Sequence, residues 1–372
     1  MEKTLGCLLG GAIGDALGAP VEFLSMNEIS CRFGPSGITG YVEFWSGQGA
    51  FTDDTQMTLF TAEGLIRAGV QDSGLQLPGV PEQTELSAED GYRRRRREAA
   101  IIESVHRAYL RWLLTQGQEP NWARARTTEA SLKAEGWLIK EKGLWIQRSP
   151  GMTCLGALRS GKSGSTADPI NVSKGCGGVM RIAPVGLWHR DPADAFRTGC
   201  EVAAITHGNA SGYLPAGLLA SIIAGLKAGS GLDESIERAI AILKSWDSHG
   251  ECLESINRAM RLAAVGATAS IPEEIGKLAG RGEARAQGGG WTAEEALSIA
   301  IYCTLRFPDD FRGGVLAAVN HDGDSDSTAA ITGNILGAKL GEHDIPPEWI
   351  AGLELAPIVE RTARELHAAA SV

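Results

Sequence analysis

The sequence has 372 residues, of which 43% are hydrophobic and 22% charged, an ordinary globular composition that argues against general disorder. Its net charge of −10 would repel phosphate backbones, so nucleic acid is not expected as a main partner. No apolar run approaches 18 residues, and Glu2 and Asp15 interrupt the apolar N-terminus, so neither a membrane span nor a signal peptide is predicted.

The seven cysteines are scattered singly along the chain, and none forms a C-x-x-C pair. An odd number of isolated thiols fits a reducing compartment better than a disulfide framework. We therefore expect a cytoplasmic protein with free thiols and no membrane partner.

In chain order, an apolar helix over 4–18 is followed by a loop rich in glycine and aromatic residues over 20–49. A second helix begins near Asp53, which has capping-box spacing to Gln56. Residues 70–97 are polar, contain Pro and Gly, and end in five consecutive arginines. This composition predicts a mobile surface excursion whose arginines form a solvated face or a helix start.

The chain is again helical at 98–115, loop-rich over 116–180 and almost entirely helical beyond. No segment shows sustained strand alternation, and no change in composition marks an interdomain linker. The sequence therefore predicts an all-α fold, with 1–372 as a single compact multi-helix domain. The later helices are expected at 192–205, 210–228, 233–246, 251–266, 292–306, 310–319, 326–341 and 347–369.

Two clusters of carboxylates and hydroxyls begin two of these helices, TDD at 52–54 and DSDS at 324–327. Acidic residues favour helix N-termini, which explains one carboxylate at each start and perhaps two. It does not explain four, because adjacent carboxylates repel one another. A hard divalent cation such as Mg²⁺ would relieve the repulsion and takes oxygen ligands. The spacing favours a metal site, with simple helix caps as the alternative.

Three further features are candidates for the same site. Asp15 lies inside an apolar helix, where it either connects the helix to a loop by buried hydrogen bonds or takes part in the chemistry. Glu22 follows in the loop beyond. The glycine-rich run SKGCGGVMR at 173–181 would expose N–H groups that suit a diphosphate, although glycine also serves packing. His207 lies at a turn between helices, where a histidine is more often a capping or core residue than a catalyst.

The run GALRSGKS at 156–163 fits the spacing of a nucleotide-binding P-loop. Such a loop needs an apolar strand before it and a helix after it, and neither flank qualifies. We therefore do not expect a nucleoside triphosphate to bind at this run.

Taken together and in this order, the motifs resemble the ADP-ribosylglycohydrolase family, of the dinitrogenase reductase-activating and ADP-ribosyl-acceptor hydrolase type. The resemblance extends from about residue 4 to about residue 341. It rests on GAIGDALGAPVEF, FTDDTQMTLFTAEGLI, GCGGVMRIAPVGL, ITHGNASGYLPAGLLASII and NHDGDSDSTAAITGNILGAKLG.

The resemblance implies an all-α fold with two Mg²⁺ ions, or Mn²⁺ as an alternative, between the acidic clusters. Glu22 and Asp54 would be the catalytic carboxylates, steering or deprotonating the attacking water. The implied metal ligands are Thr52, Asp53, Asp54, Asp324, Asp326 and Ser327. The implied substrate-binding residues are Ser173, Gly175, Cys176, Gly177, Gly178 and His207.

The implied function is Mg²⁺-dependent removal of ADP-ribose from protein arginine, with an ADP-ribosylated protein or small ADP-ribose compound as the partner. Hydrolysis of another linkage, such as a serine or O-acetyl linkage, or of a small nucleoside, is one alternative. A catalytically silent ADP-ribose-binding protein on the same fold is the other. Glu43 and Trp45 are candidates for a rim on the acceptor side, with plain packing as the alternative for Trp45.

Overall fold

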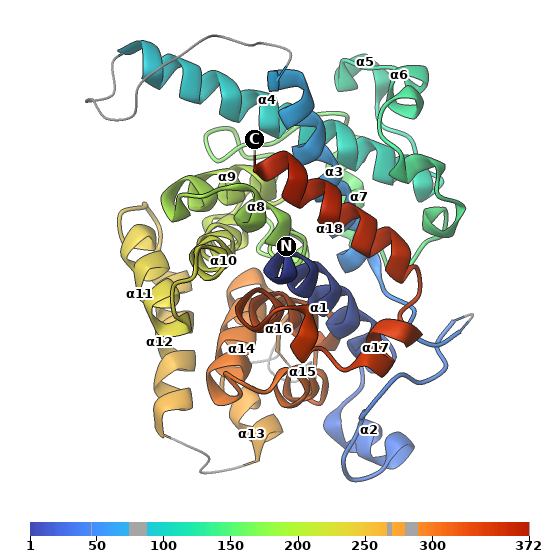
Figure 1. Ribbon diagram of the computed structural model, residues 1–372, viewed down its shortest axis with the longest axis vertical. Helices are drawn as coiled ribbons and strands as arrows, with labels where there is room; N and C mark the ends of the chain where they lie inside the picture. Colours follow the sequence, from blue (N-terminus) through green and yellow to red (C-terminus); the bar gives the residue numbers. More distant parts are fainter. Residues whose placement is uncertain (46, 74–87, 266–269, 280–288, 372) are drawn as a thin grey trace.

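The computed structural model describes residues 1–45, 47–73, 88–265, 270–279 and 289–371. Within these ranges all regular secondary structure is helical, and β-type pairing is limited to isolated bridges (Figure 1). The all-α class and the single compact body that the sequence predicts are confirmed.

The centre of the molecule is an antiparallel pair of helices from opposite ends of the chain. These are α1 (Glu2–Gly18) and α16 (Ser325–Leu340), which lie side by side in the middle of Figure 1. Almost every residue of both helices is buried. Such helices are typical of the core of a large domain rather than of its surface.

Small residues at every fourth position let these two helices pack backbone against backbone. A Cβ atom at Gly10 would lie 2.3 Å from the carbonyl oxygen of Gly333, and one at Gly18 would lie 2.4 Å from that of Ser325. Both distances are shorter than van der Waals contact, so glycine is required at these crossing points. The pairing fixes the C-terminal end of α1 beside the N-terminal end of α16.

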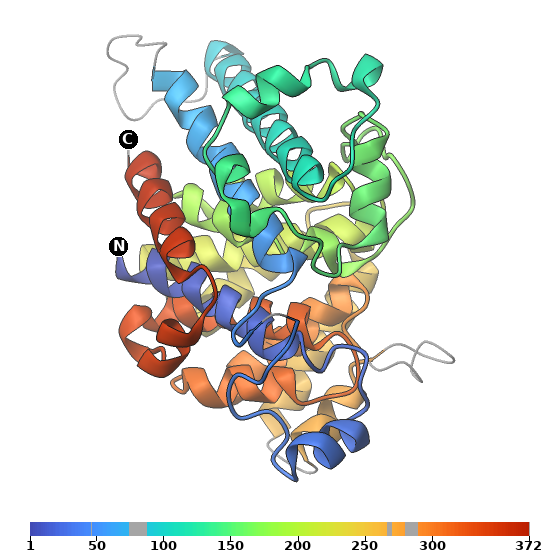
Figure 2. The same cartoon turned by 90° about the vertical axis from the view of Figure 1, so that its right-hand side faces the viewer.

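The other long helices surround this pair and are α3 (Asp53–Ser73), α4 (Ala88–Thr115), α9 (Pro192–Ala204), α10 (Ala210–Ala228), α12 (Gly250–Val265), α14 (Ala293–Arg306) and α18 (Ala356–Ala370). The C-terminal helix α18 packs against α1 and α3, and α10 packs against α9 and α14 (Figures 1 and 2). The N-terminal part of α4 lies at one end of the molecule, and the central pair lies away from that end.

Shorter elements complete the described structure. The α-helices among them are α2 (Met26–Phe33), α5 (Trp122–Ala125), α6 (Glu129–Ala134), α7 (Met152–Arg159), α8 (Ala183–Trp188), α11 (Leu232–Leu243), α13 (Ile271–Gly276), α15 (Phe311–Val319) and α17 (Pro347–Gly352). The 3₁₀ turns are η1 (Leu138–Lys140), η2 (Lys142–Leu144), η3 (Cys176–Gly178) and η5 (Glu342–Asp344).

Three sequence expectations about helices need correction. The segment expected to be a loop over 20–49 contains α2, and α13 was not predicted. The single helix expected over 347–369 is two helices, because Leu355 adopts a left-handed conformation just before α18. A left-handed residue cannot continue a right-handed helix.

Both ends of the segment expected to be a mobile surface excursion, 70–97, are helical. Helix α3 continues to Ser73 and α4 begins at Ala88, so the run of five arginines is helical. This outcome agrees with the helix-start interpretation of the arginines. The intervening residues 74–87 lie outside the described part of the chain.

Helix α10 has the length and the mean hydropathy, 1.2, of a membrane-crossing helix, which the sequence was not expected to contain. However, 83% of its apolar window is buried inside the protein. A buried core helix passes the same test, and the packing of α10 against α8, α9 and α14 accounts for its composition.

Candidate active site

The two acidic clusters lie at the N-terminal ends of α3 and α16. Asp53 and Asp54 open α3, while Asp324 caps α16 and Asp326 lies in its first turn. The loop after α1 brings Glu22 to the second cluster, where the carboxylate oxygens of Glu22, Asp324 and Asp326 lie within 4.8 Å of one another. The fold therefore brings together carboxylates from segments far apart in the sequence.

Asp15 connects α1 to the start of α3. Its Oδ1 accepts a hydrogen bond from the backbone N–H of Thr52 at 2.8 Å. Its Oδ2 accepts from the N–H of Thr55 at 2.9 Å and from the Thr55 hydroxyl at 2.6 Å. These bonds satisfy N–H groups that a helix start leaves unpaired, which supports the interpretation of Asp15 as a helix-to-loop tie.

One carboxylate oxygen in each cluster has no hydrogen-bond partner in the described structure. These atoms are Oδ2 of Asp54 and Oδ1 of Asp326, and both residues are at most 4% exposed. A buried carboxylate oxygen without a partner is energetically costly, so such groups are normally paired or coordinate a metal. The two oxygens therefore indicate that a positively charged group binds between the two acidic clusters.

Burial raises the pKa of each carboxyl group in the two clusters. It is the largest cause at Asp53, Asp54 and Asp324, whose pKa values lie well above the ordinary value, and it also raises the pKa of Asp326. Burial, followed by the charges of Asp326 and Asp324, raises the pKa of Glu22 to about 11. These groups cannot all ionise near neutral pH unless a positive charge joins them.

The chemistry of the donor set fits a hard divalent cation. Each of the six predicted ligands is buried and offers oxygen, the donor atom that Mg²⁺ and Mn²⁺ prefer. Asp53 is held by the N–H of Gly151, which donates to its Oδ2 at 3.1 Å. The six residues are Thr52, Asp53, Asp54, Asp324, Asp326 and Ser327.

The glycine-rich loop lies against the second acidic cluster. Its turn η3 contains Cys176, whose sulfur is 3.6 Å from the Ser327 hydroxyl. The N–H of Cys176 donates to the carbonyl of Trp291 at 3.2 Å, which ties the loop to the segment before α14. Ser173 precedes the turn, and its hydroxyl is 3.2 Å from that of Thr153. The predicted substrate-binding loop and the predicted metal ligands are therefore neighbours.

His207 packs directly against this loop from the end of α9. The residue is 1% exposed, and a Cβ atom at Gly177 would lie 2.9 Å from its Cε1 atom. The glycine is needed at this position because the imidazole occupies the space that a side chain would fill. All the residues predicted for substrate binding thus meet at one place.

Two aromatic residues beside the site were not predicted. Phe23 follows Glu22, has a left-handed backbone with φ of 70° and is 69% exposed. Its ring stacks on Trp291 with centroids 5.1 Å apart and an interplanar angle of 20°. An exposed aromatic residue held in an uncommon conformation is worth functional attention, but the sequence gives no sign of that conformation.

Trp45, predicted for the acceptor-side rim, is 46% exposed, and an arginine side chain already lies against its ring. The guanidinium of Arg148 lies over its ring at 5.3 Å from the centroid. The backbone of Arg148 accepts a hydrogen bond from the N–H of Asp53, so this aromatic residue does adjoin the first acidic cluster. Glu43 is exposed nearby in the sequence.

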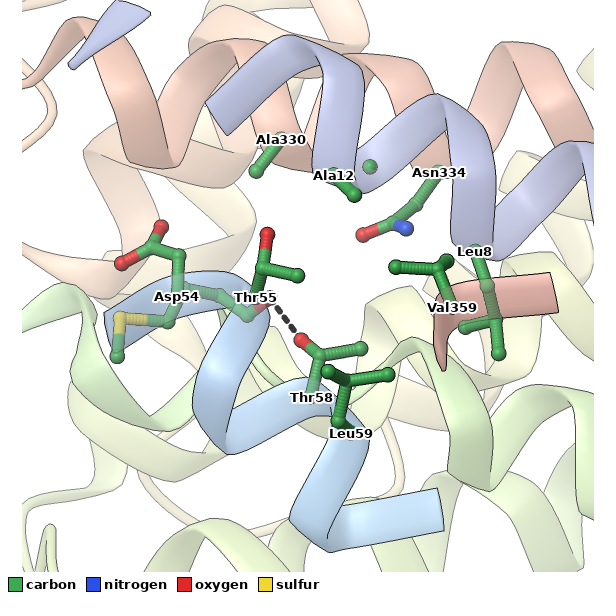
Figure 3. Close-up of a pocket in the computed structure, with 11 residues that line it drawn as sticks. Leu8, Ala12, Asp54, Thr55, Thr58, Leu59, Ala330, Asn334 and Val359 are labelled. Carbon is green, nitrogen blue, oxygen red and sulfur yellow. Dashed lines mark hydrogen bonds between the residues drawn. The ribbon is translucent and has the colours of Figure 1, made fainter. Parts of the chain in front are cut away.

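Figure 3 shows a small pocket beside the site, between α1, α3 and α16. The carboxylate of Asp54 lies at one end, and apolar side chains such as Leu8 and Val359 lie at the other. Thr55, Thr58 and Asn334 also line the pocket, but its volume of about 10 Å³ leaves room for no more than about one water molecule, so it is a packing gap rather than a substrate site.

The rejected P-loop pattern is helical where a P-loop would begin. Gly156 lies inside α7, which continues to Arg159. A phosphate-binding loop requires an open turn of exposed N–H groups at that point, so the structure supports the rejection.

Comparisons with known proteins agree over the full length of the chain. The ADP-ribosyl-[dinitrogen reductase] glycohydrolase of Rhodospirillum rubrum is 24% identical, covering 98% of this chain and 93% of that protein. The ADP-ribosylarginine hydrolase Tri1 of Pseudomonas putida (strain GB-1) is 23% identical, covering 98% of this chain and 78% of that protein.

A solved structure, an ADP-ribosylglycohydrolase-related protein complex, superposes with a TM-score of 0.57 at 22% identity, covering 99% of this chain and 98% of that one. This likeness shows the fold. Residues 1–372 match the model of the ADP-ribosylglycohydrolase family, and the chain therefore belongs to that family of hydrolytic enzymes.

Proposed function

We propose that this protein is a Mg²⁺-dependent hydrolase that removes ADP-ribose from arginine side chains of modified proteins. The observation that carries the proposal is the pair of unpartnered, buried carboxylate oxygens on Asp54 and Asp326 in the two acidic clusters. They lie in the same site as Glu22 and next to a glycine-rich loop. Free thiols at all seven cysteines support a reducing cytoplasm as its location.

The six buried oxygen ligands at the starts of α3 and α16 would hold the metal ions, with Mn²⁺ as an alternative. Bound divalent cations would neutralise the carboxylates and supply Lewis acidity toward the ribose hydroxyls and water. Asp15 does not belong to this set, because its carboxylate already accepts three hydrogen bonds. Its contribution is to fix the position of Thr52 and thereby the first cluster.

The glycine-rich loop would bind the diphosphate. Gly175 is half-buried, with Ser173 and His207 beside it, whereas Gly177 and Gly178 let the turn pack closely against His207 and Ala203. Backbone N–H groups in such a turn suit an anion. The ribose would then lie on the side of the carboxylates.

Hydrolysis requires a water molecule to attack the anomeric carbon of the ribose while the bond to the guanidine nitrogen breaks. The transition state has oxocarbenium character. In our proposal Glu22 accepts a proton from the attacking water and Asp54 orients that water. Burial and the neighbouring carboxylates raise the pKa of Glu22 to about 11, and bound cations would lower it, so that its carboxylate could act as a base. The guanidine nitrogen takes up a proton as it leaves, and the proton that Glu22 accepts from water balances this uptake.

Arginine as the acceptor is supported by the relatives whose printed names specify arginine or dinitrogen reductase. Phe23 gives a structural reason to expect arginine. It is the residue after Glu22, its ring is exposed, and a planar guanidinium stacks well on an aromatic face. Trp45 is a weaker platform, since Arg148 already lies over its ring.

Turnover of matched peptides tests the linkage. Two peptides of one sequence, carrying ADP-ribose on arginine or on serine, are compared at the same Mg²⁺ concentration. We expect faster release of ADP-ribose from the arginine peptide. A ratio below one would replace arginine by another linkage, and binding of ADP-ribose without turnover of either peptide or of O-acetyl-ADP-ribose would favour the silent binding protein.

A further inference from the structure

Arg181 is a fully buried arginine at the end of the glycine-rich motif. One terminal nitrogen, Nη2, donates to the Thr206 hydroxyl at 2.7 Å, and the other donates to the sulfur of Cys154 at 3.3 Å. The guanidinium lies over the ring of Tyr109 at 4.3 Å from the centroid, and its Nε has no partner. Its contacts are thus hydroxyl, sulfur and aromatic groups.

The other buried arginines of the described chain each form an ion pair with a glutamate. Arg111 forms an ion pair with Glu63 at 2.7 Å, and Arg148 forms one with Glu354 at 2.6 Å. Within the described residues, no carboxylate lies within ion-pair distance of Arg181. A buried charge without a counter-charge is costly, so its presence next to a predicted anion site calls for an explanation.

Thr206 transmits the effect of Arg181 to the next residue. A guanidinium can only donate hydrogen bonds, so the Thr206 oxygen must accept from it. The hydroxyl hydrogen is then available to Nδ1 of His207, which lies 2.8 Å from the same oxygen. With Nδ1 as an acceptor, the neutral imidazole carries its proton on Nε2.

The protonated edge of the ring faces the glycine-rich loop. A Cβ atom at Gly177 would lie 3.2 Å from Nε2 of His207, and one at Gly175 would lie 3.4 Å from it. Nε2 has no hydrogen-bond partner among the described residues. Burial, followed by the charge of Arg181, lowers the pKa of His207 to about 3, so the ring stays neutral over the physiological range.

We propose that Arg181 is a positioning residue that acts through Thr206 to present His207 to the substrate diphosphate as a fixed Nε2–H donor. Its unpaired charge adds positive potential behind the loop. The inference rests on the proposed function, because the anion it serves is the diphosphate of ADP-ribose. The opposite tautomer would present a lone pair to that anion and repel it.

The test uses a matched pair at position 206. Thr206→Val keeps the shape and removes the hydroxyl, whereas Thr206→Ser keeps the hydroxyl and removes a methyl group. In the full chain with Mg²⁺, calorimetry should give about tenfold weaker ADP-ribose binding for Thr206→Val and a change within about twofold for Thr206→Ser. The KM on the preferred peptide should rise by a similar factor with kcat nearly unchanged, because the effect is on binding.

A spectroscopic measurement separates positioning from a merely structural role. The ¹⁵N signals of the His207 ring are identified by their absence in His207→Gln. Wild type and Thr206→Ser should show an Nε2–H tautomer that does not titrate between pH 5 and 8. Thr206→Val should lose this single tautomer.

Each outcome decides the inference. An Nδ1–H tautomer in the wild type, or unchanged ADP-ribose binding in a folded Thr206→Val, would overturn it while leaving the proposed function intact. Failure of the wild type itself to bind ADP-ribose would instead overturn the proposed function.

Discussion

Asp15 and Glu22 are only seven positions apart, but their carboxyl groups have different roles. Both carboxylate oxygens of Asp15 accept hydrogen bonds from Thr52 and Thr55. Asp15 therefore caps the start of α3 from the neighbouring helix α1. The carboxylates of Asp53 and Asp54 are therefore not needed as caps. Glu22 lies with the α16 cluster instead, where its pKa is raised to about 11.

The metal-free protein should lose stability as the pH rises. Burial, and then the charge of Asp326, raise the pKa of Asp15 to about 7, above the ordinary value of about 3.9. A group whose pKa is raised on folding stabilises the fold fully below its unfolded pKa, and this contribution is lost as the pH rises through the folded value. In EDTA we expect calorimetry to show a Tm lower by roughly 5 °C at pH 8 than at pH 5, and Mg²⁺ should restore most of this at pH 8.

Asp326→Asn provides the comparison, because the Asp326 charge helps to raise the pKa of both Asp15 and Glu22. This variant should show a flatter fall of Tm with pH in EDTA and weaker stabilisation by Mg²⁺. Asp309→Asn is the matched control, since Asp309 is exposed and pairs only with Lys339 at the surface. Equal slopes in the two variants would contradict the electrostatic account.

At the scale of the elements, the contact between α1 and α16 positions the site. Both helices are buried almost throughout, and their backbones touch at glycines. Moving them apart by the width of one methyl group would also separate the end of α1 from the start of α16. The site therefore depends on residues that never approach the substrate.

Gly10→Ala should destabilise the protein by about 3 kcal/mol or more, because the added Cβ would lie 2.3 Å from the carbonyl oxygen of Gly333. Gly156→Ala is the control. Gly156 lies inside α7 and a Cβ there would meet nothing within 4 Å, so alanine should stabilise by about 0.5–1 kcal/mol. Urea unfolding at one pH measures both changes. A neutral Gly10→Ala would mean that the two helices can separate without cost.

Long helices with a continuous apolar pattern could be predicted from the sequence, and short ones could not. Helix α2 has a capping box from Ser25 to Glu28, and α13 has one from Ser270 to Glu273, so a local signal was present. However, their apolar faces are too short to give a periodic pattern. The contact between α1 and α16 could not be predicted either, because small-residue spacing does not name its partner.

The candidate site was predictable as a set of residues but not as a geometry. The clustered acids at 52–54 and 324–327 suggested one shared cation because of their charge. The stack of Phe23 on Trp291 and the isolation of Arg181 from any described carboxylate depend on tertiary packing. No local pattern in the sequence encodes either arrangement.

At the scale of the whole molecule, the site lies where three helix ends meet. The N-terminal ends of α3 and α16 carry the partial positive charge of their helix dipoles, which partly offsets the crowded carboxylates. The C-terminal end of α1 and the glycine-rich loop close around the same place. A single body of helices thus brings segments from both ends and the middle of the chain to one polar centre.

The most direct test of the central claim is the turnover of an ADP-ribosyl-arginine peptide by protein freed of metal with EDTA, followed by titration with Mg²⁺. The account predicts turnover reduced at least about 100-fold without metal, restored in a saturable manner by Mg²⁺, and not restored in Asp326→Asn at the same concentrations. Undiminished turnover in EDTA, or full activity of Asp326→Asn, would contradict it.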